Sequence, residues 1–145
     1  MATLGFEKLD VYRLSEKLAD LVWGVVHRWG RLAKDTVGKQ LIRAADSIGA
    51  NIAEGAGRGS FDDNRRFIRI ARGSLYETHH FLRRALARGL LDREAVDQVR
   101  VLLDELRPRL NAYLRSIGTN VPDQGRTTKD KGPRTKDKER RPKAQ

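Results

Sequence analysis

The strongest constraint on the fold is the helical spacing of apolar residues in four segments of the chain. In each segment they recur every three or four positions, which gives a helix one apolar face. No segment alternates apolar and polar residues over a useful length, so the sequence predicts no sheet. The predicted apolar faces are Val11, Leu14, Leu18, Leu21, Val25 and Trp29; Val37, Leu41, Ala45, Ile48 and Ile52; Phe67, Ile70, Ala71, Ser74, Phe81 and Ala85, widened by Ile68, Leu75 and Leu82; and Ala95, Val99, Leu102, Leu106, Leu110, Tyr113 and Ile117.

The breaks between these segments are short and contain residues that begin and end helices. Short connections make successive helices antiparallel. The sequence therefore predicts an all-α fold, an antiparallel up-down four-helix bundle over residues 1–118. The predicted N-caps are Asp10, Asp35 and Asp92, with Ser60 and Asp63 resembling a capping box, and the predicted helix ends are Gly30, Gly55, Gly89 and Gly118.

Residues 119–145 differ sharply in composition from the rest of the chain. They contain 9 basic and 4 acidic side chains and almost no apolar residue. Such a segment cannot bury enough surface to offset the entropy of ordering it. We therefore expect a disordered, basic C-terminal tail that adds non-specific affinity for polyanions.

The charge balance points to a polyanionic partner. The chain carries 30 basic and 19 acidic side chains, a net charge of +11, and its first 118 residues are basic by themselves. Nucleic acid is the first candidate for such a protein, and an anionic membrane surface is the second. Because the basic tail has no hydrophobic anchor and no lipidation motif, we expect no membrane partner. The chain has no cysteine, no signal-peptide core and no apolar run long enough to cross a bilayer, so we expect a cytoplasmic protein.

A line of basic and aromatic residues runs along the third segment. At about 100° per residue its members fall within roughly 40° of one line, opposite the predicted apolar face. Arginine suits phosphate contact, and a tyrosine among arginines can stack on a base. We call this line the basic stripe; it comprises Arg65, Arg69, Arg72, Tyr76, His79 and Arg83.

Three interpretations of the basic stripe are consistent with the sequence. The one we favour is a nucleic-acid-binding surface. A solvated helix face is the second, although such a face usually mixes opposite charges at i and i+4. A subunit contact paired with acidic residues of another chain is the third.

A second line of polar residues lies along the helix predicted around residues 37–54. Its two charged residues, Arg43 and Glu54, are three turns apart, so they need partners on other helices or other chains. We favour a hydrogen-bonding network at a helix–helix or subunit contact over an ordinary exposed face or a ligand site. Tyr12 and Trp23, off the apolar centre of the first segment, fit a subunit interface. We call this second line the polar stripe; it comprises Gln40, Arg43, Ser47, Asn51 and Glu54.

The run from Gln40 to Gly55 resembles a known family. Its pattern, Q-x-x-R-A-A-x-S-I-x-x-N-I-A-E-G, is similar to that of four-helix-bundle proteins encoded in intervening sequences of bacterial 23S ribosomal RNA genes. The family's I-A-x-G-S-L-x-E pattern is matched from Ile70 to Glu77, and its opening F-x-x-L-x-V-Y is matched from Phe6 to Tyr12. The resemblance covers about residues 5–118 and excludes the tail.

The resemblance implies a helical subunit that assembles with itself, usually as a homopentamer. It also implies kinship with the accessory proteins of diversity-generating retroelements, which are basic pentamers that bind nucleic acid and partner a reverse transcriptase. It implies structural or interface roles for the motif residues, including Glu77. It implies no biochemical activity for the intervening-sequence proteins themselves.

No motif predicts catalysis, a metal or a cofactor. Glu77 and His80 have the spacing of a di-iron ligand pair, but the chain has no second such pair. The glycine-rich stretch from Gly55 to Gly59 follows a predicted helix instead of a strand, and it lacks the lysine of a phosphate-binding loop. We therefore expect a non-enzymatic protein that binds nucleic acid, with a protein-interaction scaffold, for example for a reverse transcriptase, as the alternative.

Overall fold

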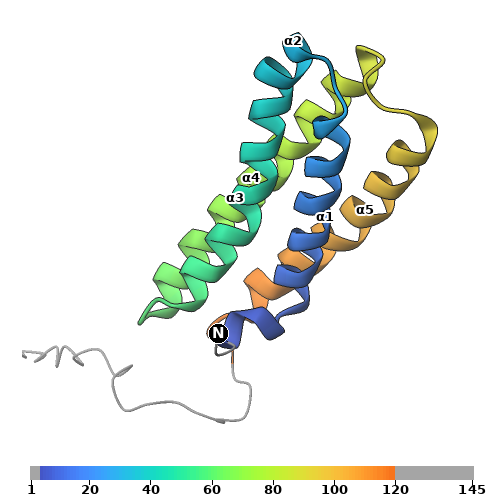
Figure 1. Cartoon of the computed structure of the whole chain (residues 1–145). Helices are drawn as coiled ribbons and strands as arrows, with labels where there is room; N and C mark the ends of the chain where they lie inside the picture. The colour runs from blue at the N-terminus through green and yellow to red at the C-terminus, as the bar shows by residue number, and fades with distance from the viewer. Residues whose placement is uncertain (1–3, 120–145) are drawn as a thin grey trace, which may run out of the picture.

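The computed structural model describes residues 4–119, and over this range the protein is a helical bundle without strands (Figure 1). The prediction of an all-α four-helix bundle is confirmed. Residues 120–145, which contain nearly all of the predicted tail, lie outside the described range. The elements are the 3-10 helix η1 (Gly5–Lys8), α1 (Asp10–His27), α2 (Arg31–Ala33), the π-helical turn η2 (Lys34–Gly38), α3 (Lys39–Ala56), α4 (Phe61–Ala87) and α5 (Arg93–Ser116).

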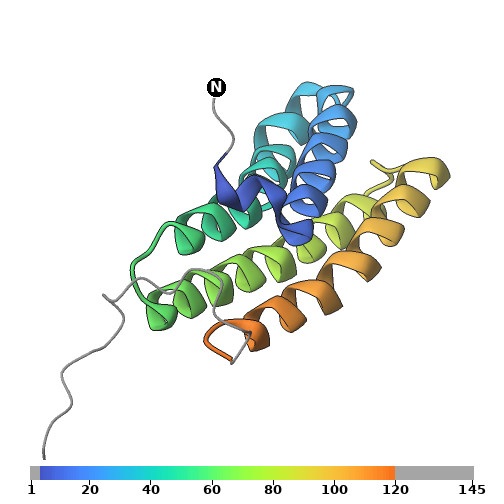
Figure 2. The ribbon, with the colours of Figure 1, turned by 90° about the horizontal axis from the view of Figure 1, so that it is seen from below.

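The four long helices α1, α3, α4 and α5 pack so that each has two neighbours. Helices α1 and α4 both contact α3 and α5, which places α1 and α4 diagonally across the bundle. Figure 2 shows two layers, with α1 and α3 in one and α4 and α5 in the other. Helix α2, the turn η2 and α3 follow one another without a break, so they form one helical run from Arg31 to Ala56.

The core lies between the two layers and contains most of the predicted apolar residues. The predicted face of the second segment is buried along its whole length, from Val37 in η2 to Ile52 in α3. On α1 the core residues are Val22 and Val26 instead of Leu21 and Val25, and on α5 Leu103 is more buried than Leu102. Apolar residues flank both sides of each predicted face, so packing against two neighbouring helices, and not the pattern alone, decides the rotation of each helix.

The predicted face of α4 is likewise rotated. Ile70 was predicted to be in the core and is instead 44% exposed, whereas Thr78 is fully buried. A buried hydroxyl is tolerated there because Thr78 Oγ1 donates to the Ser74 carbonyl at 2.7 Å on the preceding turn. The centre of the buried face therefore includes a polar position that a hydrophobicity pattern does not count.

The helix ends confirm some of the predicted signals and correct others. Asp92 Oδ1 accepts from the Ala95 amide at 2.8 Å, and Ser60 Oγ accepts from the Asp63 amide at 3.1 Å, so both are N-caps. The prediction for Asp10 is wrong, because α1 begins at Asp10 with Leu9 as its cap. Asp35 is also not a cap, because it lies inside the π-helical turn.

The helix ends predicted at four glycines are likewise confirmed at two positions and corrected at the other two. Gly89 and Gly118 follow α4 and α5 with φ of +71° and +78°, a region that favours glycine. Gly30 precedes α2 as its N-cap instead of ending α1. Gly55 lies inside the last turns of α3, where a Cβ would come within 2.7 Å of Asn64 Oδ1 on α4. Its role is therefore to let α3 and α4 approach closely.

Candidate nucleic-acid interface

Helix α4 carries the largest concentration of positive charge in the described part of the chain. Residues 64–88 include seven arginines and one acidic residue, Glu77. The rotation of the helix is fixed by a continuous buried face on its other side, and this face determines where each arginine points. The fully or largely buried residues of α4 are Ile68, Ala71, Ser74, Leu75, Thr78, Leu82 and Ala85.

The structure divides the basic stripe into two rows, each with its members seven positions apart. Arg65, Arg72 and His79 form what we call the seam row, because all three are half-buried against α5. The prediction that the whole stripe faces away from the bundle is wrong for these three residues. Their side chains start at the edge of the buried face and extend over the neighbouring helix.

The contacts of the seam row tie α4 to α5. Arg65 Nη1 donates to the Ile117 carbonyl at 2.8 Å, and Arg65 also pairs with Asp62. Arg72 Nη1 donates to Asn111 Oδ1 at 3.3 Å. His79 Nδ1 lies 3.4 Å from Arg107 Nη2, which donates to it when that nitrogen is unprotonated. These groups are engaged within the bundle.

The other three members, Arg69, Tyr76 and Arg83, form what we call the outer row. All three are exposed, and Tyr76 is 54% exposed. Neither arginine forms an ion pair or a side-chain hydrogen bond with another residue between 4 and 119. The row is about 21 Å long at 1.5 Å per residue, so it can meet several successive phosphates.

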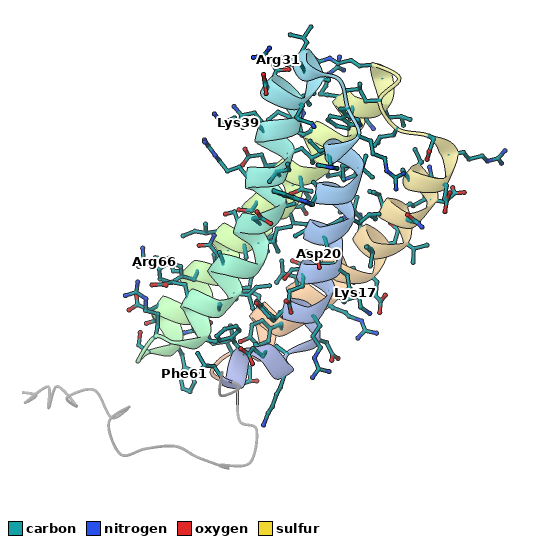
Figure 3. The ribbon with its side chains drawn as sticks, viewed as in Figure 1. Lys17, Asp20, Arg31, Lys39, Phe61 and Arg66 are labelled. Atoms are coloured by element: carbon teal, nitrogen blue, oxygen red, sulfur yellow. The ribbon has the colours of Figure 1, made fainter. Side chains whose placement is uncertain are left out.

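Exposed arginines extend the positive surface on both sides of the outer row. Arg66 projects outward from α4 in Figure 3, and its Nε lies 3.7 Å from Asp63 Oδ1. Arg84 and Arg88 are exposed near the end of the helix, where a cation also complements the helix dipole. The acidic residues of the first turn thus neutralise the beginning of α4, and its remaining length carries the uncompensated charge.

An exposed glycine, Gly73, lies in the middle of this positive surface. A Cβ built at Gly73 would have no heavy atom within 4 Å. Glycine in a helix interior costs about 1 kcal/mol relative to alanine. No contact within the bundle requires glycine here, so the open backbone leaves room for a ligand to approach α4 closely.

The polar stripe of α3 is partly engaged inside the bundle. Ser47 Oγ accepts from Asn51 Nδ2 and from Ser74 Oγ, both at 3.0 Å, so these three residues join α3 to α4. Glu54 pairs with Arg58 across one turn at 2.5 Å. Gln40 and Arg43, like Glu77 on α4, are exposed, and within the described range none of the three forms a side-chain hydrogen bond.

An acidic groove of about 380 Å³ between α1 and α3 was not predicted from the sequence. Glu16 and Asp20 of α1 and Asp46 of α3 line it. Desolvation in the groove, and second the charge of Asp20, hold the pKa of Asp46 above its usual value. The i, i+4 spacing of Glu16 and Asp20 was visible in the sequence, but their proximity to Asp46 depends on the packing of two helices.

The two aromatic residues predicted at an interface have different environments. Tyr12 is half-buried beside the acidic groove, with its ring edge-on to Phe6 at 4.9 Å between centroids. Desolvation, followed by the charges of Glu16 and Glu7, raises the pKa of Tyr12. Trp23 is 60% exposed on α1.

The described residues hold no group of three or more side chains placed to bind a metal ion. His80 packs edge-on against Phe81, at 5.1 Å between ring centroids, and is exposed. None of the helices in the described range is both long enough and apolar enough to span a membrane.

Residues 7–112 match the model of the 23S rRNA-intervening sequence protein family. The chain belongs to this family. The match covers all four long helices except the end of α5, and it includes the polar stripe and both rows of the basic stripe. The family assignment based on the Gln40–Gly55 motif is therefore confirmed.

A solved structure supports the fold of this family member. It is the crystal structure of a protein of unknown function from the S23 ribosomal protein family of Bacteroides thetaiotaomicron. The two chains are 23% identical, the alignment covers 73% of this chain and 96% of that one, and the TM-score is 0.65. No curated protein matches the chain.

Proposed function

We propose that this family member is a non-enzymatic, homo-oligomeric protein that binds nucleic acid through the outer row of α4. The observation that carries the proposal is the pair of exposed arginines, Arg69 and Arg83, which lack acidic partners among residues 4–119 and flank the exposed ring of Tyr76. A solvated helix face without a ligand would gain stability from acidic partners at i±4, and this row has none.

The chemistry of the outer row favours contact with the backbone of the nucleic acid. Guanidinium groups contact phosphates regardless of sequence, and a tyrosine ring stacks on any exposed base. The row has no asparagine or glutamine to read a base edge, so we expect little sequence preference. Single-stranded RNA or DNA is the favoured ligand class, because only an unpaired base can stack on Tyr76.

Fluorescence anisotropy with labelled RNA, single-stranded DNA and duplex DNA tests the proposal on the full chain. The Arg69→Glu/Arg83→Glu variant should bind at least tenfold more weakly than the wild-type chain, and its log K against log salt slope should be shallower by about 2. Lys17→Glu/Lys39→Glu is the matched control, because it changes the net charge equally at two positions on other helices (Figure 3).

If the two double variants weaken nucleic-acid binding equally, only net charge matters, and the outer row is not the binding surface. Tyr76→Ala separates stacking from charge. It should weaken binding to single strands by roughly 1–3 kcal/mol and leave duplex binding nearly unchanged. Loss of duplex binding alone would contradict the proposed preference for single strands.

The homo-oligomeric part of the proposal has independent support from the distribution of charge. The α1–α3 groove presents Glu16, Asp20 and Asp46, and Arg84 and Arg88, which do not belong to the outer row, are exposed at the end of α4, so one subunit offers complementary surfaces to another. Trp23, which is 60% exposed on α1, is typical of an interface residue. A homopentamer is the state that the family resemblance implies, and sedimentation equilibrium at low and high salt tests it.

The second candidate function is a protein-interaction scaffold, for example for a reverse transcriptase. Trp23, Leu32 and Leu86, on three different elements, favour this function. Exposed apolar side chains suit contact with a protein better than contact with phosphate. A saturable complex with one protein, together with nucleic-acid binding that is lost at physiological salt, would select this alternative.

A further inference from the structure

A groove between α4 and α5 shares Arg83 with the outer row but is otherwise lined by different residues. It lies toward the ends of these helices that the 88–92 connection joins, and its volume is about 280 Å³. Its floor is aliphatic, with Leu82, Val99 and Leu103 largely buried, and Leu86, at 49% exposure, stands at its mouth. No phenylalanine, tyrosine or tryptophan lines it.

The rim of this groove is basic. Arg83 and His79 of α4 and Arg100 and Arg107 of α5 line it, and Asp104 is its single acidic residue. Within the described part of the chain, none of these three arginines forms an ion pair. The groove therefore combines an aliphatic floor with positive charge that the protein itself leaves uncompensated.

The size and lining of the groove narrow the choice of occupant. Its volume is slightly below the roughly 300–1,000 Å³ of ligand-binding cavities, so it suits a few aliphatic side chains better than a cofactor. A nucleobase is bound best by an aromatic ring on which it can stack, and the only ring in the lining, the imidazole of His79, already lies 3.4 Å from Arg107 Nη2. Residues 119–145 of the same chain, with 9 basic and 4 acidic side chains, would be repelled by the rim.

We propose that the α4–α5 groove binds an acidic amphipathic helix of a partner protein. Aliphatic side chains spaced i, i+3/i+4 and i+7 on that helix pack on the floor, as in other helix-in-groove complexes. Its glutamates and aspartates face Arg83, Arg100 and Arg107. The α5 wall from Val96 to Arg107 is about 16 Å long, which matches three turns of the bound helix.

This proposal concerns a different ligand from that of the nucleic-acid interface, and the two surfaces share only Arg83. Leu86 and Arg100 belong to the groove and not to the outer row, and Arg69 and Tyr76 belong to the outer row and not to the groove. Variants at these positions therefore separate the two functions in the same protein.

A fluorescein-labelled synthetic peptide of about 16 residues, with leucine on one helical face and glutamate on the other, is the probe. Titration with the full chain should give saturable binding. Leu86→Glu and Arg100→Glu should each weaken binding roughly tenfold, the effect of losing one important interface contact. The matched controls are Val101→Glu, at a 65% exposed position of α5 outside the groove, and Lys39→Glu on α3; both should bind as the wild-type chain does.

Three outcomes would overturn the proposal. A scrambled peptide of the same composition could bind equally well, which would show that charge alone drives the contact. The Leu86→Glu variant, with an unchanged circular dichroism spectrum, could bind the peptide as tightly as the wild-type chain. Alternatively, Leu86→Glu could dissociate a self-assembled form and leave peptide binding intact, which would make the groove a contact between copies of this chain.

Discussion

Two glycines on neighbouring helices, one buried on α3 and one exposed on α4, should respond in opposite ways to substitution by alanine. Gly55→Ala places a methyl group 2.7 Å from Asn64 Oδ1, 3.0 Å from Phe67 Cβ and 3.1 Å from the Asn64 carbonyl oxygen. The amide oxygen can move, but the other two atoms are fixed to the α4 backbone. The overpacking costs about 1–3 kcal/mol, and the gain in helix propensity near the end of α3 is at most about 1 kcal/mol, so the variant should be less stable by about 1–2 kcal/mol.

Gly73→Ala adds the same methyl group where no atom lies within 4 Å. It should therefore stabilise the bundle by about 1 kcal/mol through helix propensity alone. Urea and thermal unfolding followed by far-ultraviolet circular dichroism measure both variants, and each kcal/mol should shift Tm by roughly 3–5 °C for a domain of this size. A Gly55→Ala variant as stable as the wild-type chain would refute the close approach of α3 and α4. A destabilised Gly73→Ala variant would show that another molecule covers α4.

Three further substitutions test individual contacts. Ser47→Ala removes the acceptor shared by Asn51 and Ser74, so it should lower the free energy of unfolding by about 1–2 kcal/mol in urea unfolding. The control Gln40→Ala, at an exposed position of α3, should change that free energy by less than about 0.5 kcal/mol. Asp92→Ala should cost about 1 kcal/mol through loss of the α5 cap. Asp10→Ala, which caps no helix and loses only an exposed ion pair with Arg109, should cost less, and a larger loss in Asp10→Ala than in Asp92→Ala would contradict the assignment of the caps. The pKa of Asp46 is raised on folding above the usual 3.8, so its contribution favours the folded state at low pH and is lost as pH rises through the folded-state pKa. Asp46→Asn should therefore raise Tm at neutral pH and leave Tm unchanged in acid. An unchanged Tm at both pH values would exclude this effect.

The sequence was sufficient to predict the number, order and approximate limits of the long helices. The periodicity that predicts them reports burial on one face, and burial is what holds each helix in the bundle. The caps Ser60 and Asp92 were also predictable, because a cap depends on residues three positions away. The rotation errors at Leu21, Val25 and Ile70 have a tertiary cause, since two neighbours compete to bury adjacent sides of the same helix.

The division of the basic stripe could not be predicted from α4 alone. A helical wheel gives the direction of Arg72 relative to the buried face, but it does not show that Asn111 of α5 lies within reach of that arginine. The acidic groove could not be predicted for the same reason, because Asp46 of α3 lies near Glu16 and Asp20 of a different helix, α1. Long polar side chains near the edge of a buried face are therefore the positions where a single-helix analysis fails, because the partner helix decides whether they are engaged or free.

Arg83 connects the two proposed binding surfaces. It ends the outer row and also lines the α4–α5 groove, so one guanidinium group is available to either a phosphate or a carboxylate of a partner helix. Each ligand would therefore reduce the affinity of the other, and the reduction must be equal in both directions because binding free energies are linked. Arg69 and Tyr76 contact only the nucleic acid, and Arg100 and Leu86 contact only the partner helix. The two ligands therefore compete only for Arg83. On this arrangement, a protein that occupies the groove would loosen a nucleic acid held along α4 without displacing it completely.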